Sequence, residues 1–243
     1  MKTKIIRIDE VDSTNRFLRT YQPEGDEDMV VAVANYQTAG KGQGSHVWEG
    51  EKGKNLLFSI LVYPNWAPVV RQFLLSMAGA LAIKDALDTY TDGITLKWPN
   101  DVYWNDKKIS GTLIETSVDS RGIKKCIFGI GLNINQKVFL SDAPNPVSLC
   151  QIVGHEVDRE EVLQKIVDAF EKYYELLRRA DYMDVAGLYH LALYRRKGYH
   201  WYEDKEGKFE GAFVEVEDDG HLILHDKQGV IRSYTFGEIQ FVN

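Results

Sequence analysis

The feature that most restricts the fold of this chain is a series of β-branched and aromatic segments separated by very short turns. Asn105-Asp106 and the tetrapeptide at 119–122 have the composition of tight turns. Strands joined this closely pair antiparallel, since a parallel pair needs a crossover of a dozen or more residues. We therefore predict a largely antiparallel sheet that includes strands at residues 94–98, 102–104, 108–116 and 124–132.

Two long segments carry apolar residues at helical spacing. Pro68 suits a first helical turn, and the period after it continues to Tyr90. Asp158, with Glu161 three residues later, resembles a capping box, and the helix that it begins is expected to end near Arg179. Shorter helices are expected at residues 13–21 and 184–194, and further strands at 4–8, 29–34 and 55–63. This mixture predicts an α+β fold.

The pattern changes after Gly198, where strand-like segments at 212–216, 221–225 and 231–236 alternate with acidic turns. A length of 243 residues allows one large domain, or one large and one small. We expect a first domain at residues 1–197 and a separate small β module at 198–243. The module holds most of the chain's net charge of −7, with 4 Lys and Arg against 10 Asp and Glu.

This charge distribution argues against nucleic-acid binding, which needs clustered Lys and Arg to neutralise phosphates. Cys126 and Cys150 lie in apolar surroundings without the spacing of a metal site or a disulfide framework, as expected in a reducing compartment. The N-terminus lacks the apolar core of a signal peptide, and no apolar run approaches the ~18 residues of a membrane span. We expect a cytoplasmic protein that binds neither membrane nor nucleic acid.

A glycine-rich segment at residues 37–48 lies between two predicted strands. Glycines at every second position from 40 to 44 let backbone N–H groups approach an anion, and donor side chains accompany them at Lys41, Gln43 and His46. The segment is neither a P-loop, whose pattern is missing, nor a Rossmann turn, since no helix follows it. Taken alone, a flexible surface loop would explain it as well.

The segment from Lys97 to Val102 reads Lys-Trp-Pro-Asn-Asp-Val. A lysine at a strand end can place positive charge on a substrate oxygen, and the adjacent Asn100 and Asp101 can orient a ribose or Mg²⁺. An ordinary turn with a solvated lysine is the alternative. Gly111 and Gly131 interrupt later apolar strands, as glycines do where a ligand lies against the backbone or where a helix crowds the sheet.

Taken together and in this order, the segments resemble the biotin protein ligases, also called biotin–acetyl-CoA-carboxylase ligases. The resemblance covers nearly the whole chain. It implies a mixed sheet flanked by helices, related to class II aminoacyl-tRNA synthetases, and a C-terminal SH3-like barrel. The residues that carry it are Asp12-Ser13-Thr14-Asn15, Gln37 to Gly42 with Trp48, Lys97 to Val102, Ser110-Gly111 and Gly129 to Asn135.

The resemblance implies a two-step reaction. Biotin and ATP, with Mg²⁺, give biotinyl-5′-AMP and pyrophosphate, and a lysine of a biotin carboxyl carrier protein domain then takes the biotin. Members of the family that also repress transcription have an N-terminal helix-turn-helix, which has no counterpart here, so no repressor function is expected. Members differ in whether they dimerise, so a monomer and a homodimer both stay open.

Site residues follow from the same resemblance. Lys97 is the implied catalytic residue, in contact with the biotin carboxylate and the α-phosphate, and the ligands of Mg²⁺ stay open. Biotin would be bound by Ser13, Thr14, Asn15, Gln37, Gly40, Lys41, Gly42, Gln43, Lys97, Gly111 and Gly131. ATP and the adenylate would be bound by Lys41, Gln43, His46, Trp48, Asn100, Asp101 and Asn133.

The chain departs from the family's usual Gly-Arg-Gly-Arg-x-Gly-Arg-x-Trp. Lys41, Gln43 and His46 stand at the arginine positions, and Ser45 replaces a glycine. A lysine lacks the bidentate fork of arginine and glutamine is neutral, so we expect a weaker phosphate clamp. A lipoate–protein ligase is one alternative, although its Arg-Arg-x-Ser-Gly-Gly-Gly stretch is missing. A catalytically dead binding module is another, against which the retained Lys97 argues.

Overall fold

The computed structural model describes residues 1–44, 46–120, 122–140 and 144–242. Its main body is a seven-stranded sheet with the strand order β1-β2-β3-β7-β6-β5-β4. Only the pair of β1 and β2 is parallel, and the other neighbours within this sheet are antiparallel, which confirms the expected mixed, largely antiparallel sheet. The strands are β1 (Thr3–Val11), β2 (Met29–Gln37), β3 (Leu56–Val62), β4 (Ile94–Lys97), β5 (Asp101–Trp104), β6 (Lys107–Asp119) and β7 (Gly122–Leu132).

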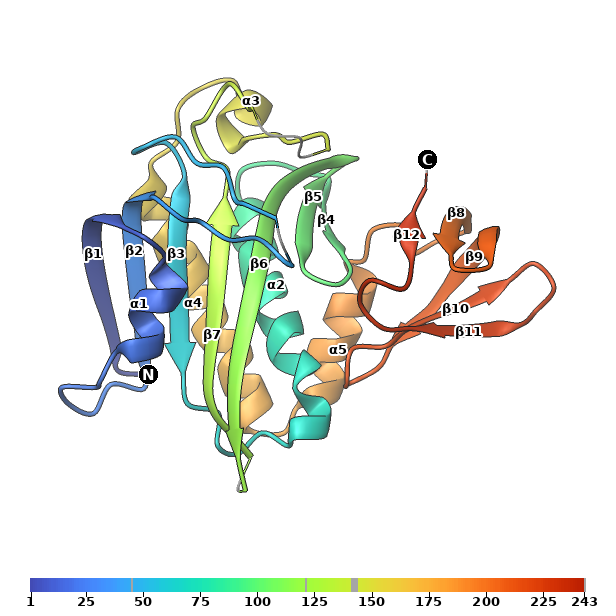
Figure 1. Cartoon of the computed structure of the whole chain (residues 1–243), viewed down its shortest axis with the longest axis horizontal. Coiled ribbons are helices and arrows are strands. Elements are labelled where there is room, and N and C mark those ends of the chain that lie inside the picture. Colours follow the sequence, from blue (N-terminus) through green and yellow to red (C-terminus); the bar gives the residue numbers. More distant parts are fainter. Residues whose placement is uncertain (45, 121, 141–143, 243) are drawn as a thin grey trace.

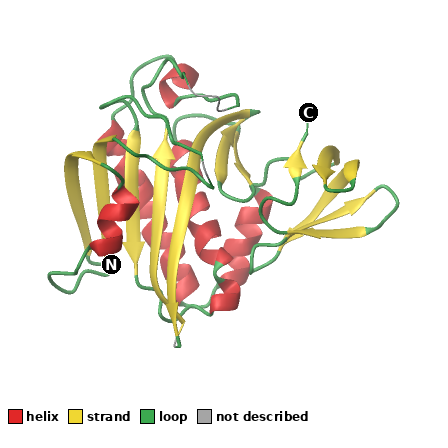
Figure 2. Ribbon diagram, viewed as in Figure 1, coloured by secondary structure: helices red, strands yellow, loops and turns green. Residues whose placement is uncertain are grey.

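Helices lie on both faces of this sheet (Figures 1 and 2). The main core forms on the face covered by α2 (Phe73–Leu87), α4 (Arg159–Arg178) and α5 (Tyr182–Leu191). The short α1 (Thr14–Thr20) packs on the opposite face through a small cluster around Leu18. Because successive side chains of a strand point to opposite faces, buried residues of β2 contribute alternately to the two cores.

The helix starts differ in detail from those expected. The prediction of one helix from Pro68 is wrong at its first turn. Pro68 has an extended backbone, a separate 3₁₀ turn follows at Val69–Arg71, and α2 begins only at Phe73. Asp158 does cap α4, by accepting from the backbone N–H of Glu160 at 2.9 Å. The reciprocal capping box is instead at Ser148 and starts α3 (Leu149–Val153), which was not predicted.

The C-terminal region forms a second, antiparallel sheet with the order β11-β10-β9-β8-β12. Its strands are β8 (Tyr199–Asp204), β9 (Gly207–Val216), β10 (Leu222–Asp226), β11 (Ile231–Tyr234) and β12 (Gln240–Phe241). β8 and β12 were not predicted. A domain boundary at residue 198 stays a prediction, and the sheet contacts the main body, where Trp98 Nε1 donates to the Gly220 carbonyl at 3.0 Å.

Both cysteines are buried free thiols, and burial raises the pKa of Cys126. Among the residues that the structure describes, no helix combines the length and the apolarity needed to cross a membrane.

Candidate active site

A network of buried polar side chains lies where α1 meets the sheet. The Thr14 hydroxyl is 2.7 Å from the hydroxyl of Ser59 in β3, and Ser59 donates to Asn15 Oδ1 at 2.6 Å. Gln37, at the end of β2, accepts from the backbone N–H of Thr14 at 2.7 Å. Thr14, Asn15 and Ser59 are buried. Ser13 begins α1 as its N-cap.

This network consists of neutral donors and acceptors, the groups that a buried urea or amide needs. It lies against β7, where a Cβ atom on Gly129 would overlap the side-chain amide of Asn15. The structure therefore brings together four predicted residues, Ser13, Thr14, Asn15 and Gln37. Ser59 was missed by the sequence analysis, although a single hydroxyl within the apolar run 56–62 is a signal that could have drawn attention to it.

Two facing glycines form a flat surface beside the network. Gly111 of β6 and Gly131 of β7 are direct partners across the two strands. The Trp48 indole covers both, because a Cβ atom on Gly131 would overlap the ring and one on Gly111 would lie 3.1 Å from Cζ3. We call Gly111 and Gly131 the glycine floor. Since Gly129 and Gly131 share one side of β7, the floor and the polar network occupy the same face of the sheet as α1.

The glycine-rich segment folds as a small hairpin that leads to Trp48. Lys41 and Val47 form a β-bridge, and the N–H of Gly42 donates to the His46 carbonyl at 2.8 Å. Gly44 lies in the turn with a φ of +63°, a conformation that favours glycine. Lys41 and His46 are exposed. The structure thus places these two predicted phosphate ligands at the surface, apart from the buried network.

Lys108, which the sequence analysis missed, lies at the edge of the glycine floor. Its Nζ is 2.6 Å from the Asp101 carboxylate and 5.8 Å from the centre of the Trp48 ring. A Cβ atom on Gly111 would lie 3.2 Å from the same Nζ. Only the pairing of β5 with β6, in which Asp101 faces Gly111, brings these groups together. Lys108 is therefore a second candidate cation for an anionic substrate.

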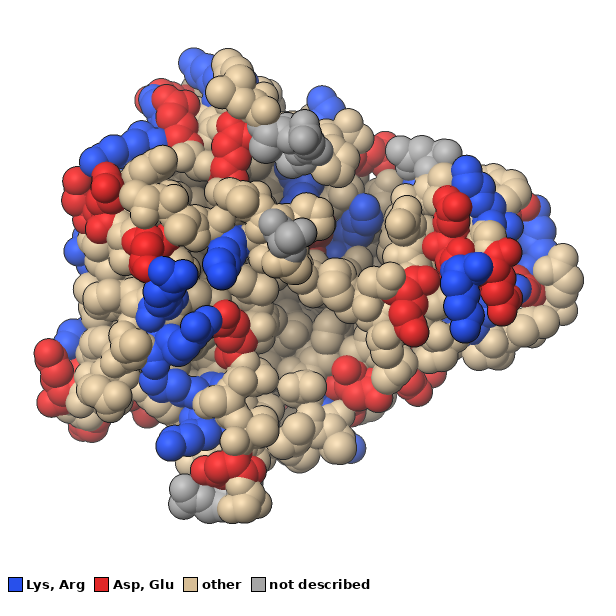
Figure 3. Space-filling model, viewed as in Figure 1, with Lys and Arg blue, Asp and Glu red and all other residues tan. Residues whose placement is uncertain are grey.

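Lys97 lies on the other side of Asp101, its partner across the turn between β4 and β5. Its Nζ donates to the Tyr103 hydroxyl at 2.9 Å and faces two aromatic rings, Tyr103 at 4.6 Å and Phe241 at 5.1 Å. Burial lowers the pKa of Lys97, and the charge of Asp101 opposes this shift. Figure 3 shows a hollow between the main body and the C-terminal sheet, with Lys or Arg atoms inside it.

The two predicted asparagines have different surroundings. Asn100 donates to the Thr112 carbonyl at 2.7 Å and so fastens the start of β5 to β6. Asn133 is buried and donates to the Val147 carbonyl at 3.2 Å, but its Oδ1 has no hydrogen-bond partner among the described residues. A buried acceptor without a donor is costly. Asn133 is therefore the better placed of the two to accept a hydrogen bond from a ligand.

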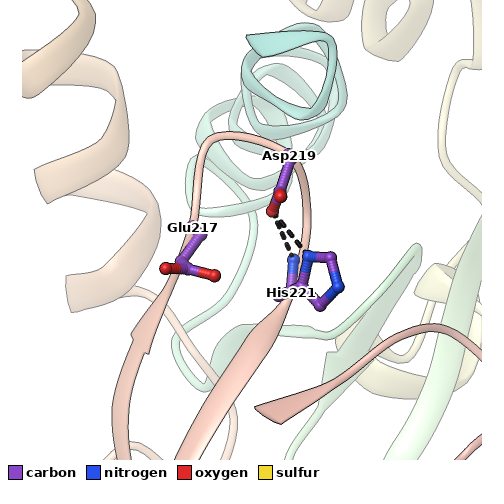
Figure 4. Close-up of side chains that lie close together, drawn as sticks. All are labelled: Glu217, Asp219 and His221. Carbon is purple, nitrogen blue, oxygen red and sulfur yellow. Dashed lines mark hydrogen bonds and ion pairs between the residues drawn. The ribbon is translucent and has the colours of Figure 1, made fainter. Parts of the chain in front are cut away.

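Oxygen donors suited to Mg²⁺ are few at this site. Asp101 offers a carboxylate and Asn133 a free carbonyl oxygen, and Mg²⁺ usually takes one or two such ligands together with substrate phosphates. Within the described ranges, the one cluster with three potential metal ligands is Glu217, Asp219 and His221, in the turn between β9 and β10 (Figure 4). The donor set near Lys108 thus fits an ion that arrives with a nucleotide.

The site therefore has a neutral polar end, an aromatic-covered middle and a cationic end. Such an arrangement suits an enzyme that binds a small carboxylic acid by its polar head and activates the acid group with a nucleotide. The sequence model of the biotin/lipoate A/B protein ligase family matches residues 8–135, and the chain belongs to this family.

Individual relatives agree with this assignment. The biotin–[acetyl-CoA-carboxylase] ligase of Paracoccus denitrificans is 30% identical over 227 residues, which cover 90% of this chain and 92% of that protein. The bifunctional ligase/repressor BirA of Bacillus subtilis is 28% identical and matches 97% of this chain, but only 73% of its own length. The biotin protein ligase of Aquifex aeolicus, solved in complex with biotin and ATP, superposes with a TM-score of 0.81 at 27% identity, covering 98% of this chain and 99% of that one. The family and the α+β fold expected from the sequence are confirmed.

Proposed function

We propose that this chain is an ATP-dependent biotin–protein ligase. The observation that carries the proposal is the position of the Trp48-covered glycine floor between the neutral network around Asn15 and the two lysines that flank Asp101. The network suits the ureido ring of biotin, and the lysines lie at the opposite end, where its carboxylate would meet ATP. Relatives that match nearly the full length of the chain are named as biotin ligases, one of them solved with both substrates.

In the first step, a carboxylate oxygen of biotin attacks the α-phosphorus of ATP, the bond to the β-phosphate breaks, and pyrophosphate leaves. The reactants are both anions, so positive charge and positioning dominate the barrier. Lys108 and Lys97 supply that charge within the protein. Mg²⁺ bound to the phosphates would neutralise part of their charge.

In the second step, the amine of a carrier lysine attacks the acyl carbon of biotinyl-5′-AMP. The acyl–oxygen bond breaks, AMP leaves, and the amine nitrogen loses a proton. The acceptor that we propose is a biotin carboxyl carrier protein domain of a biotin-dependent carboxylase. The residues that we propose for biotin and for the adenylate are those predicted from the sequence, with Ser59 and Lys108 added by the geometry.

The test is transfer of labelled biotin to a purified carrier domain, with ATP and Mg²⁺. We expect covalent incorporation that depends on ATP and on the acceptor lysine. Incorporation of lipoate but not of biotin would make the chain a lipoate ligase, the other activity that the family name covers. Tight binding of biotin without adenylate formation would make it a binding module.

We also propose a cytoplasmic enzyme, either monomeric or homodimeric, that binds no DNA. The support is the nearly neutral charge of residues 1–197, which gives phosphates no excess of cations to bind. A shifted band of labelled duplex DNA with this protein, in a mobility-shift assay at physiological salt, would contradict this part of the proposal.

A further inference from the structure

The C-terminal sheet contacts the segment that contains Lys97 at two places. Its β9–β10 turn accepts a hydrogen bond from Trp98 through the Gly220 carbonyl, and β12 places the Phe241 ring 5.1 Å from Lys97 Nζ. Figure 1 shows β12 on the side of the C-terminal sheet that faces β4 and β5. A residue of the C-terminal sheet thus lies beside the lysine that the proposed reaction uses.

Phe241 is held in place by contacts on several sides. Its strand partner is Tyr202, whose ring meets it edge-on at 5.1 Å, and Tyr194 stacks on it at 6.5 Å. Arg195 donates to the carbonyl of the next residue, Val242, at 2.9 Å. A strand of only two residues is therefore anchored both to its own sheet and to the segment that follows α5.

The contact with Phe241 restricts what the Lys97 side chain can do. A lysine ammonium on its four-carbon stem has many rotamers, and a point charge helps a reaction only where it is aimed. Aromatic faces attract cations, most strongly where water is excluded. Tyr103 supplies one ring and the acceptor oxygen from β5, and Phe241 closes the cage from the other sheet.

We infer that Phe241 is a positioning residue, which holds the Lys97 ammonium between its own ring and that of Tyr103 in the orientation needed for adenylate formation. This inference rests on the proposed function. It gives the C-terminal sheet a role in the first step, carried out through Lys97, and not in the recognition of biotin, whose polar network lies against β3 and β7.

The first experiment compares adenylate formation by the unmodified protein and by Phe241→Ala, Phe241→Leu and Phe241→Tyr. Loss of a cation–π contact corresponds to roughly a 2- to 30-fold change in rate. We expect Phe241→Ala to lower kcat by a factor within this range and Phe241→Leu to lower it less. Phe241→Tyr keeps the ring face, so its kcat should stay near that of the parent. The KM for biotin should change little. Phe236→Ala is the matched control, since Phe236 is 54% exposed in the turn between β11 and β12.

A double-mutant cycle with Lys97→Ala separates positioning from a general loss of structure. If Phe241 acts through Lys97, Phe241→Ala should cost nothing further once the lysine is gone. Multiplicative losses in the cycle would overturn the inference. Thermal unfolding of each variant checks that the fold is retained. If Phe241→Ala unfolds, Phe241→Leu takes its place in the cycle, because leucine keeps most of the buried volume.

The pH profile provides an independent readout. Charged groups near Lys97 are Asp101, Arg195 and Lys108, together with the phenol of Tyr103, and burial is the main reason that the pKa of Lys97 is lowered. Removing the ring takes away an aromatic face that favours the ammonium, but it also admits water, and burial is the largest influence on this pKa. The gain in hydration should therefore outweigh the lost contact, and the alkaline limb of the rate should move to higher pH in Phe241→Ala. An unmoved limb would contradict the inference. An inactive parent protein would instead overturn the proposed function, whereas an active parent matched by Phe241→Ala and Phe241→Leu would overturn this inference alone.

Discussion

The Trp48 indole lies directly on Gly131, with no room between them for a side chain. Trp48 ends the glycine-rich hairpin and Gly131 lies within β7, 83 positions later in the sequence. Two features that are separate in the sequence, an alternating glycine loop and glycines inside apolar strands, are therefore one feature in space. The loop supplies the cover and the strands supply a flat surface beneath it, beside the buried network around Asn15.

Gly131→Ala should displace the indole from the floor. Forcing an extra carbon into a filled site costs about 1–3 kcal/mol, which corresponds to a loss of roughly 5- to 150-fold in affinity for a ligand that needs Trp48 in place. Calorimetric titration with biotin and with an ATP analogue measures the loss. Gly187→Ala is the control, because Gly187 is exposed on α5 with open space around it and should gain up to about 1 kcal/mol of stability. Unchanged affinities in Gly131→Ala would contradict a role for the floor.

Ser59→Ala should weaken biotin binding and leave ATP binding nearly unchanged. Ser59 is fully buried and donates to Asn15 Oδ1, so the alanine leaves a buried acceptor without its donor, at a cost of about 1–3 kcal/mol. We expect the KM for biotin to rise roughly 5- to 150-fold. Steady-state kinetics with each substrate varied in turn provides the measurement. An equal rise in the KM for ATP would place Ser59 outside a biotin-specific subsite.

The sequence predicted most strands and helices to within a few residues, because the apolar periods of β3, β7, α2 and α4 are long and regular. β12 could not be predicted in this way. It has two residues, and only its pairing with β8 makes it a strand. Two residues carry too little pattern to mark an element.

The candidate site was predicted where its residues lie close together in the sequence, as Ser13, Thr14 and Asn15 do. Lys108 was missed because no local motif marks it. Its relation to Trp48, 60 positions earlier, exists only through the hairpin and through the register that sets Asp101 opposite Gly111. Ser59 was missed for a similar reason, since its neighbours in sequence are apolar and its partners come from α1.

The two lysines should differ in what their loss does. Lys97→Ala removes one positive charge and should slow adenylate formation by 100-fold or so, the scale seen for a single electrostatic contact, while folding stays nearly intact. Lys108→Ala also leaves the Asp101 carboxylate without its partner, so that a negative charge faces two anionic substrates. We therefore expect the rate of adenylate formation to fall further in Lys108→Ala than in Lys97→Ala. Release of labelled pyrophosphate measures both rates.

Adding Asp101→Asn to Lys108→Ala separates the two effects of that lysine. The double variant should recover part of the lost rate, because the exposed carboxylate is gone. No recovery would show that repulsion from the unpaired carboxylate does not outweigh what Asp101 contributes as a candidate ligand of Mg²⁺ and the adenylate. Adenylate formation within a few-fold of the parent in Lys97→Ala would remove Lys97 from the catalytic role predicted for it.

The C-terminal sheet should lose stability in acid through Asp226. Its carboxylate accepts from the backbone N–H groups of Val230 at 2.9 Å and Gln228 at 3.0 Å and pairs with Arg232 at 3.1 Å, and these contacts, the Val230 bond first, hold its pKa below the usual value. A lowered carboxyl pKa stabilises the fold above the unfolded value of about 3.9, and this contribution disappears as the pH falls through the folded value. Asp226→Asn should therefore unfold at a lower temperature than the parent at pH 7, and the two melting temperatures should approach each other below about pH 4.

Asp181→Asn is a control, since the Asp181 side chain makes no hydrogen bond to the helix that it precedes. A gap between parent and Asp226→Asn that stays constant from pH 7 to strong acid would show that the charge of Asp226 does not contribute.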